Sequence, residues 1–393
     1  MKLLIVTHNY IRAEGDFAGV FLHLMARKLS ENGVEVHVVA PHDAAIAEYE
    51  EIGGVKVYRF RYARDDKETL AYRGDMHRQV IRNPLKLFRL WRFLRASYKL
   101  CCRVIEREKI ELVSVNWLIP NGIVGGWLRK KYGERIDLLL SSHGTDIRLL
   151  VRFPIMLAFL KRTIRQARRW TVVSNYLKEL IVGKDAEAAE KIEVLPFPSD
   201  ETIFYPDDAI EKDADLVVAV ARLTKQKRLS YLIAAIKSLV ENRPGIKLNI
   251  YGGGPEKGNL EREIDDFGLV GRVRILKPIP QSVLREVYNR ASVVVLNSVG
   301  EGFGLALVEA MLCRTAVVGT RSGGITDIID EDENGLLVAP DDVEELAGAI
   351  ERLLGDKALR ERLAGAGYKK AREWFSSEGA SRQFRQLISE RDL

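Results

Sequence analysis

Short apolar runs alternate with segments of helical pattern in two separate series along this chain of 393 residues. The first series begins with apolar runs at 2–7 and 34–40, which flank an amphipathic segment at 19–30. Runs of this length are typical of strands that are buried on both faces of a parallel sheet, and the segments between them supply the covering helices. Because the series starts again at 216–220, the sequence predicts an α/β protein with two doubly wound sheets.

The length of the chain also exceeds what one compact core usually contains and indicates about two domains. Residues 196–215 begin with Pro196 and Pro198 and end in the charged run EKDAD, which is typical of a linker between domains. We therefore predict a first domain at 1–200 and a second domain that begins at residue 201.

Charge is divided unevenly between these halves. Residues 1–200 contain 34 Lys and Arg against 24 Asp and Glu, a net +10, whereas residues 201–393 contain 27 against 31, a net −4. The basic half is expected to face an anionic partner, either a membrane surface or nucleic acid. The sequence favours a cytoplasmic location for three reasons. Its three cysteines do not form a disulfide framework, it has no apolar run of 18 residues, and residues 1–41 lack a signal-peptide pattern.

Two segments of the first half combine basic and apolar side chains. In the predicted helix at 84–108 the basic residues recur every three or four positions, and they are Lys86, Arg89, Arg92, Arg95, Lys99, Arg103 and Arg107. We expect its core face to carry Leu87, Leu90, Trp91, Leu94, Tyr98, Cys101 and Ile105, with Phe93 and Leu100 beside the basic face. The second segment, 148–170, contains seven basic and no acidic residues. Both segments are interpreted either as solvated arginine faces or as membrane contacts, and the lack of known nucleic-acid-binding motifs disfavours nucleic acid.

The stretch 297–310, NSVGEGFGLALVEA, follows a predicted buried strand at 292–296. Gly302 and Gly304 form a turn in which the backbone can approach a ligand closely, and residues 305–314 are predicted to be helical. A helix N-terminus behind a glycine turn offers free N–H groups and a positive dipole end, so this stretch favours an anion.

Two carboxylates bracket this turn. Glu301 precedes it, and Glu309 lies in an apolar helix, where it either pairs with another group or belongs to a solvated helix face. Another acidic pair, Asp213 and Asp215, has the character of metal ligands but precedes its strand and therefore lies at the wrong end. Because no His/Cys cluster has metal-ligand spacing either, we expect no metal.

Turns with related chemistry follow other strands of the second series. The turn at 221–228 contains four cations, Arg222, Lys225, Lys227 and Arg228, and predicts either a diphosphate clamp or an ordinary basic loop. The turn at 252–254 consists of glycines, but position 257 is Lys where a dinucleotide-binding fingerprint requires its third glycine. The turn therefore either lets a ligand approach the backbone closely or is a plain tight turn. Because carboxyl ends of parallel strands meet at one edge, these turns together predict a ligand site there.

One residue of the first series has a similar position. His143 follows the predicted strand at 138–142 and is expected to lie at the ligand edge of the first sheet. A single histidine in such a place is either structural or a ligand contact.

Together these motifs resemble those of the retaining glycosyltransferases of family four, whose GT-B fold consists of two Rossmann-like domains that face a cleft. The resemblance extends over nearly the whole chain. Its most specific part is the Glu-x7-Glu spacing of Glu301 and Glu309, which follows the basic loop in the family's order. Three further stretches are similar to the family's patterns: GGITD at 323–327, HGTD at 143–146 and NGLLV at 334–338.

The resemblance implies a role for each of these positions. Arg222 and Lys227 would neutralise the donor diphosphate, and Glu309 would bind the ribose hydroxyls. Glu301 would hold the transferred sugar and the α-phosphate together with the backbone amides of Phe303, Gly304 and Leu305. The remaining contacts would be His143 with the donor sugar, Pro278 and Ile279 with the base, Gly19 with the phosphate, and Gly253 in a glycine turn that a ligand can approach.

Some positions depart from the family's pattern. Arg228, Thr326 and Asp327 stand where the family usually has Gly, Pro and Glu, and Ala18 precedes Gly19 where two glycines are common. These departures leave the identity of the donor open. The last helix, 375–393, would pack back on the first domain, so that the second domain would end at 374.

The implied function is that of a retaining, metal-independent hexosyltransferase that moves a sugar from a UDP- or GDP-sugar to a glycan or lipid-linked acceptor. The nucleotide sugar would be a co-substrate, and no cofactor is expected. The basic half adds the expectation of a peripheral contact with an anionic membrane, at the inner face of the plasma membrane, and no nucleic-acid partner. The alternatives are a sugar-nucleotide epimerase with the same fold, which needs no acceptor groove, and a non-catalytic scaffold, which should have lost some of the four charged residues at the donor site.

Overall fold

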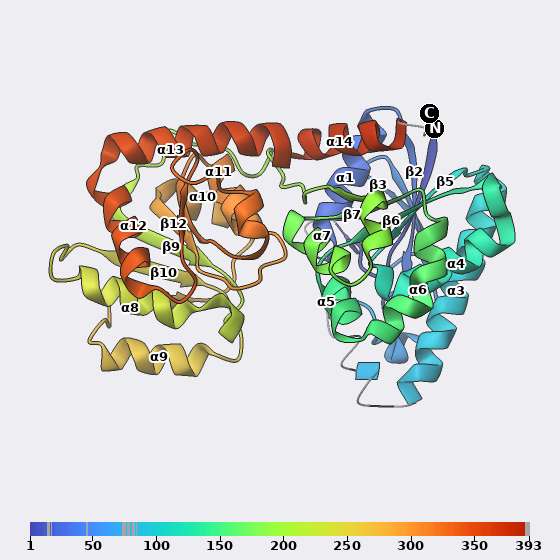
Figure 1. Cartoon of the computed structure of the whole chain (residues 1–393), viewed down its shortest axis with the longest axis horizontal. Helices are drawn as coiled ribbons and strands as arrows, with labels where there is room; N and C mark the ends of the chain where they lie inside the picture. The colour runs from blue at the N-terminus through green and yellow to red at the C-terminus, as the bar shows by residue number, and fades with distance from the viewer. Residues whose placement is uncertain are drawn as a thin grey trace. The chain divides into compact units, whose positions relative to one another are not determined.

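The computed structural model describes residues 1–13, 16, 18–44, 46–72, 76, 79–80, 83 and 85–389, with the side chain of residue 85 left aside. The chain divides into two compact units, one formed by Met1–Leu195 with Ser381–Leu393 and the other by Pro196–Ala380 (Figure 1). Each unit contains a sheet of mostly parallel strands with helices on both faces. The predicted α/β class with two Rossmann-like sheets is confirmed.

The first unit is built on an eight-stranded sheet with the order β3-β4-β2-β1-β5-β6-β7-β8. Its strands are β1 (Lys2–Val6), β2 (Glu35–Pro41), β3 (Tyr49–Ile52), β4 (Val55–Phe60), β5 (Leu112–Asn116), β6 (Asp137–Ser142), β7 (Arg169–Val172) and β8 (Ile192–Val194). Its helices are α1 (Val20–Glu31), α3 (Leu85–Glu108), α4 (Leu118–Tyr132), α5 (Thr145–Arg152), α6 (Pro154–Gln166) and α7 (Asn175–Val182). Because β1, β5 and β6 are parallel neighbours in the sheet, the residues that follow them lie close together.

One strand of this sheet was not predicted from the sequence. Strand β3 is short, has alternating exposed and partly buried residues, and pairs with β4 in the antiparallel direction. It lies at the sheet edge, where a strand does not need the apolar run that marks the buried strands β1 and β5.

The second unit has a six-stranded, entirely parallel sheet with the order β11-β10-β9-β12-β13-β14. Its strands are β9 (Asp213–Val220), β10 (Lys247–Tyr251), β11 (Val273–Leu276), β12 (Ala291–Leu296), β13 (Ala316–Thr320) and β14 (Leu336–Val338). Its helices are α8 (Leu229–Leu239), α9 (Lys257–Asp266), α10 (Gln281–Arg290), α11 (Leu305–Leu312), α12 (Val343–Gly355) and α13 (Lys357–Lys370), and α14 (Ser377–Ser389) follows. Figure 1 shows α8 and α9 on one face of this sheet and α10 and α11 on the other.

The predicted linker ends earlier than expected. Asp213 and Asp215 are the first residues of β9 and form ion pairs with Lys247 and Arg243, each at 2.8 Å. Residues 213–215 of the charged run therefore form the amino end of a strand, where the carboxylates pair with cations of neighbouring elements.

The orientation predicted for α3 is correct for part of the helix only. Leu94, Cys101 and Ile105 are buried as expected, but the placement of Leu87 and Trp91 in the core is wrong, since they are 60% and 50% exposed. The placement of Phe93 beside the basic face is also wrong. Phe93 is fully buried, with its ring centroid 4.8 Å from that of Phe60 and 5.0 Å from that of Tyr62.

Aromatic packing against β4 and the segment after it therefore fixes the rotation of α3, and helical periodicity cannot reveal this packing.

None of the helices among the described residues is long and apolar enough to cross a membrane.

Candidate functional site

Three turns meet at the carboxyl edge of the second sheet, after β9, β12 and β13. The backbone N–H of Val299 donates a hydrogen bond to the carbonyl oxygen of Gln226 at 3.0 Å and joins the first two turns. The N–H of Gly324 donates to the carbonyl oxygen of Glu301 at 2.8 Å and joins the last two. These bonds place the cation-rich turn beside the carboxylate turn, although some 70 residues separate them in the chain.

An ion pair between Lys227 and Glu301 lies at the centre of this edge. The Glu301 Oε2 atom also accepts a hydrogen bond from the hydroxyl of Ser298 at 2.9 Å, and both charged side chains are mostly shielded from solvent. Arg222 is exposed and forms no ion pair with any residue that the structure describes. The site thus combines one cation held by a carboxylate with a second that can bind an incoming anion.

Two glycines give this edge its close backbone contacts. Gly323 has φ 65°, and a β-carbon there would lie 2.4 Å from the carbonyl oxygen of Glu301. Gly304 has φ 127° and precedes α11. The side chain of Phe303 packs 5.6 Å from the ring of Phe375, so only its backbone is available to a ligand at the turn. The first amides of α11, from Leu305 onward, follow directly.

Glu309 is partly buried and has a fully buried partner. The hydroxyl of Tyr288 on α10 donates a hydrogen bond to Glu309 Oε2 at 2.9 Å. Burial raises the pKa of the Glu309 carboxyl to about 7, although the hydrogen bond from Tyr288 acts in the opposite direction. This geometry excludes the solvated-face alternative. Sequence reasoning missed Tyr288, because nothing in the local pattern of α10 distinguishes it from a core residue.

The glycine turn after β10 serves mainly to pack backbone on backbone. A β-carbon at Gly252 would lie 1.9 Å from the carbonyl oxygen of Ala221, and one at Gly254 would lie 2.4 Å from that of Leu223. At Gly253 the nearest atom would be Pro278 Cγ at 3.9 Å, so this glycine and the turn after β11 border open space. The tight-turn interpretation therefore explains two of the three glycines.

Arg228, which departs from the family's glycine, occupies a position that favours glycine. Its φ is 47°, in the left-handed region, and it caps the start of α8. The guanidinium forms an ion pair with Asp341, with Nε 2.8 Å from Oδ1, and its terminal Nη2 donates a hydrogen bond to Oδ2 at 3.3 Å. It also lies over the ring of Tyr231. Side-chain contacts thus offset the backbone strain that an arginine carries there.

In the first unit, His143 lies directly after β6. Its Nε2 is 3.1 Å from Oδ1 of Asn116, whose amide nitrogen donates to Ser114, so His143 donates through Nε2 and keeps its lone pair on Nδ1. Burial lowers the pKa of His143 to about 3, which leaves the ring neutral at physiological pH. Its ring centroid lies 4.4 Å from that of Trp117.

Asp146 shapes the His143 turn. Its buried carboxylate accepts backbone N–H bonds from His143 at 3.1 Å, Gly144 at 3.2 Å and Leu118 at 2.8 Å. The carboxylate therefore joins the turns after β5 and β6. Gly19 permits a close backbone contact with the loop after β1, because a β-carbon at Gly19 would lie 2.5 Å from the carbonyl oxygen of Asn9.

His8 is a site residue that the sequence reasoning missed. It follows β1, and its ring centroid is 4.9 Å from that of Trp117. The amide nitrogen of Asn121 donates to the backbone oxygen of Asn116 and also to His8 Nδ1 at 3.2 Å, so the proton of His8 resides on Nε2. Burial lowers the pKa of His8 to about 4. The signal that could have identified it is its position after a buried strand, which it shares with His143.

Comparison with known proteins agrees with this geometry. Residues 18–201 match the family model described as Glycosyltransferase Family 4, and residues 201–370 match the model described as Glycosyl transferases group 1. The chain belongs to glycosyltransferase family four.

Its relatives include the N-acetyl-alpha-D-glucosaminyl L-malate synthase of Bacillus anthracis, 28% identical over 72% of this chain and 75% of the relative. A GDP-mannose-dependent alpha-(1-6)-phosphatidylinositol monomannoside mannosyltransferase of Mycolicibacterium smegmatis is 29% identical over 67% of this chain and 72% of its own. Among solved structures, the sucrose-phosphate synthase of Thermosynechococcus elongatus superposes with a TM-score of 0.79 at 23% identity, over 99% of this chain and 98% of that one. The superposition shows the GT-B fold.

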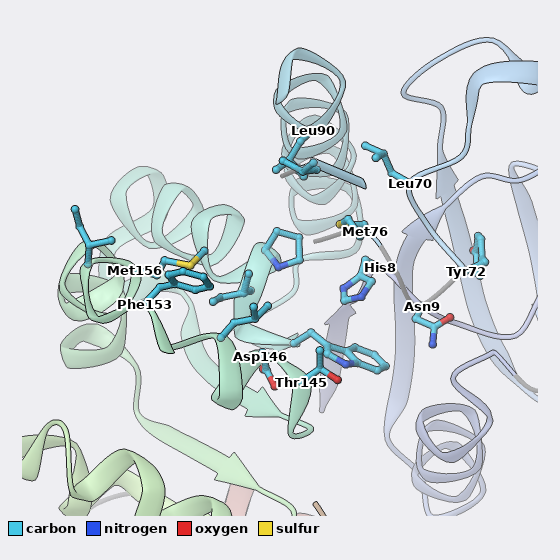
Figure 2. Close-up of a pocket in the computed structure, with 16 residues that line it drawn as sticks. His8, Asn9, Leu70, Tyr72, Met76, Leu90, Thr145, Asp146, Phe153 and Met156 are labelled. Atoms are coloured by element: carbon cyan, nitrogen blue, oxygen red, sulfur yellow. The ribbon is translucent and has the colours of Figure 1, made fainter. Parts of the chain in front are cut away.

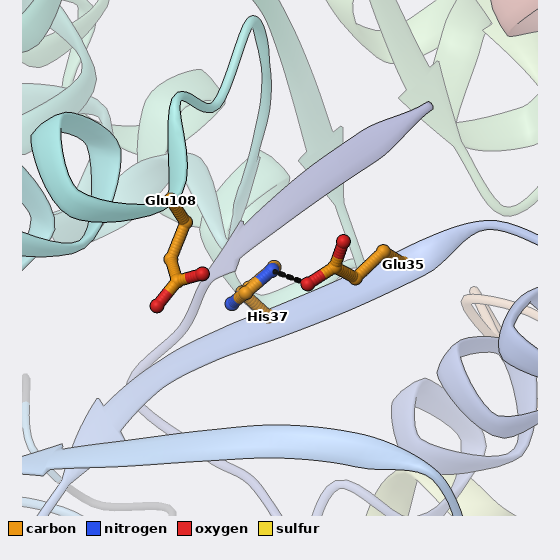
Figure 3. Close-up of side chains that lie close together, drawn as sticks. All are labelled: Glu35, His37 and Glu108. Carbon is orange, nitrogen blue, oxygen red and sulfur yellow. Dashed lines mark ion pairs between the residues drawn. The ribbon is translucent and has the colours of Figure 1, made fainter.

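Two groups of acidic and histidine side chains in this glycosyltransferase have the spacing of metal ligands. Figure 3 shows Glu35, His37 and Glu108, which gather near the amino end of β2, the opposite end from His8 and His143. Glu35 already forms an ion pair with Lys56 at 2.7 Å, and Glu108 forms one with Arg107 at 2.7 Å.

The second group consists of His42, Asp65 and Glu68. Here His42 Nδ1 is 2.7 Å from Glu68 Oε2, and Asp65 is paired with Arg61. In both groups protein cations or hydrogen bonds already engage at least one oxygen of each carboxylate.

Proposed function

We propose that this chain is a retaining glycosyltransferase that transfers a sugar from a nucleotide-diphosphate sugar without a divalent metal. The observation that supports this most is the Lys227–Glu301 ion pair beside the exposed Arg222, at the edge where parallel strands bind ligands. Lys227 and Arg222 bind the diphosphate, and the first amides of α11 add the positive end of the helix.

The other donor contacts follow along the same edge. Glu301 is placed to accept hydrogen bonds from hydroxyls of the transferred sugar, and Glu309 from the ribose hydroxyls. The base lies against the backbone at Pro278 and Ile279, with Gly253 as its neighbour. UDP- and GDP-sugars remain the two donor classes to test, since the name of one relative specifies GDP-mannose.

In the reaction, the bond between the anomeric carbon and the phosphate oxygen breaks, and the nucleoside diphosphate leaves with the electron pair. The acceptor oxygen attacks the oxocarbenium-like centre from the same face, so the configuration is retained. The acceptor proton goes to the departing phosphate oxygen. The protein's part is electrostatic, because cations and amides stabilise charge that develops on the leaving group. Neutral His143 binds a hydroxyl of the donor sugar and places no positive charge beside the cationic centre.

The acceptor site belongs to the first unit, and we propose a lipid-linked acceptor reached from an anionic membrane. A groove of about 440 Å³ runs along α3 and β4 and is lined by Arg92, Arg95, Lys99 and Arg103. Among the described residues that line this groove, Glu48 is the acidic one, and its carboxylate pairs with Arg61 at 2.7 Å. The groove therefore keeps an excess of positive charge that suits lipid phosphates. The inner face of the cytoplasmic membrane is the location that fits such a peripheral enzyme.

A sugar-nucleotide epimerase and a silent scaffold are the competing functions. Turnover of UDP-, GDP- and ADP-sugars separates them, combined with a thermal-shift panel of the same compounds. A transferase releases free nucleoside diphosphate and, with water as acceptor, initially the sugar in its retained anomeric form, which NMR detects. Interconversion of sugar epimers without lasting release supports the epimerase. Stabilisation without turnover of any donor, even with candidate acceptors present, supports the scaffold.

A further inference from the structure

The first unit contains an apolar pocket that the donor chemistry does not use. Its volume is about 560 Å³, within the range of roughly 300–1,000 Å³ typical of small-molecule sites. Figure 2 shows it between the loop after β1, the start of α3 and the junction of α5 with α6. Its apolar walls include Leu70, Met76, Leu90, Leu149, Phe153 and Met156.

One end of the pocket is polar and the other is not. His8, Asn9, Thr145 and Asp146 line the end next to the carboxyl edge of the sheet. Asp146 is occupied by three backbone N–H groups, and His8 is a neutral donor through Nε2. No Lys or Arg is among the described residues that line the pocket, so it does not suit a phosphate. It suits an apolar body with a hydroxyl-bearing head.

Exposed apolar side chains lie at and near the lining of the pocket. Phe153 and Ile155, which line it, are 37% and 80% exposed, and Leu87, one helical turn before the lining residue Leu90 on α3, is 60% exposed. Apolar side chains gathered in this way mark a contact with an apolar partner. Arg92 and Arg95 follow on the same helix and line the basic groove. An apolar opening beside uncompensated positive charge matches the surface of an anionic bilayer, from which a lipid chain can pass into the pocket.

We propose that this pocket binds the hydrocarbon chain of the acceptor, with the acceptor's hydroxyl-bearing head at His8 and Asn9. This inference rests on the proposed transferase function and names the chemical class of its acceptor. A soluble acceptor with an aromatic aglycone is the competing occupant.

The test uses n-alkyl β-D-glucosides below their micellar concentrations as probes, with chains from four to ten carbons. Affinity is measured by titration calorimetry on the full chain. Burial of each CH₂ group should tighten binding about fourfold until the pocket is filled. Leu149→Trp, which fills the pocket, should abolish the dependence on chain length, and Met156→Trp serves as a second variant in case the first is unstable. Val283→Trp adds the same indole to an exposed helix position of the other unit and should leave the dependence unchanged.

Affinity that does not change with chain length, or a dependence that survives in both filled variants, would overturn the proposal. So would tight binding of 4-nitrophenyl glucoside with no gain from alkyl chains, which would identify the aromatic occupant. Donor binding is measured in parallel by thermal shift with UDP- and GDP-sugars. If chain-length dependence is found but no donor binds, the proposed transferase function fails while the pocket assignment is retained.

Discussion

The hydroxyl of Tyr288 donates a hydrogen bond to Oε2 of Glu309 at 2.9 Å, and burial of the pair raises the pKa of Glu309 to about 7. A carboxyl group with such a pKa changes charge near neutral pH. Ribose hydroxyls need an acceptor, and the ionised carboxylate accepts more hydrogen bonds than the protonated acid. Donor affinity should therefore depend on the protonation state of this one residue.

The sign of this dependence follows from the pKa. Below pH 7 Glu309 is mostly protonated and above it mostly ionised, so donor affinity should rise with pH and level off near pH 8. If only the ionised form binds, the gain from pH 6 to pH 8 is about tenfold. Calorimetry with a nucleotide sugar measures this change in affinity. The ligand itself does not titrate in this pH range, because its diphosphate lies between two sugars and has no terminal phosphate. Glu309→Gln should remove the dependence, and Tyr288→Phe should move its midpoint to higher pH. A flat profile for the unmodified protein would contradict the assignment.

Removal of either leaving-group cation should abolish most transfer. Lys227→Ala and Arg222→Ala should each lower kcat by about 10²–10³-fold, since loss of one such electrostatic contact costs about 3 kcal/mol of barrier. Lys225→Ala is the matched control, because Lys225 is an exposed cation of the same turn. Circular dichroism and melting should show the three variants folded. Near-normal turnover in Lys227→Ala or Arg222→Ala would show that the diphosphate binds elsewhere.

Transfer should continue in an excess of EDTA. Lys227, Arg222 and the amides of α11 supply the positive charge that a divalent cation supplies in metal-dependent enzymes. The rate with and without chelator, followed by addition of Mg²⁺ or Mn²⁺, measures this directly. Loss of activity with EDTA and its recovery with either metal would require a metal in the mechanism and would direct attention back to Asp213 and Asp215.

Arg228→Gly should be tolerated. The change relieves the strain of an arginine at φ 47° but removes the surface ion pair with Asp341. Each effect is about 1 kcal/mol or less, and they have opposite signs, so the melting temperature should change little. Arg228→Val keeps the strain and loses the pair, so it should lower the melting temperature clearly. Equal melting temperatures for the two variants would mean that backbone strain at this position is unimportant.

Much of the fold could be predicted because buried parallel strands have a strong local signal. Strands β1, β2, β6 and β12 begin and end within one residue of their predicted bounds. The gathering of turns after β9, β12 and β13 could be predicted as well, since parallel strands place their carboxyl ends at one edge. What joins them, such as the hydrogen bond from Val299 to Gln226, depends on the fold.

The parts that could not be predicted depend on contacts between distant segments. The partner of Glu309 comes from α10, and the rotation of α3 is set by Phe60 and Tyr62. The apolar pocket is formed by four segments, none of which shows a pocket in its own pattern. The roles of the donor-site residues stay predictions that experiments with ligands must decide.

The basic groove along α3 leads to the last prediction, which concerns the membrane. Arg92, Lys99 and Arg103 form no ion pair with an acidic side chain in the described part of the chain, and Trp91 is half exposed beside them. Each basic residue near an anionic bilayer contributes about 1 kcal/mol of attraction. Sedimentation with phosphatidylglycerol-containing vesicles should therefore show binding that weakens as salt shortens the range of the charges.

A variant with three groove charges reversed combines Arg92→Glu, Arg95→Glu and Lys99→Glu. Its affinity for vesicles should be lower by about 100-fold or more, since three attractions become repulsions. The control reverses three exposed cations of the other unit, Lys237, Arg274 and Lys357, and has the same net charge. If the control loses binding equally, the attraction comes from overall charge and the groove has no special part in it. Absence of vesicle binding at low salt, with full activity on a soluble sugar acceptor, would exclude the membrane contact altogether, because a lipid acceptor can be reached only by an enzyme that meets the bilayer.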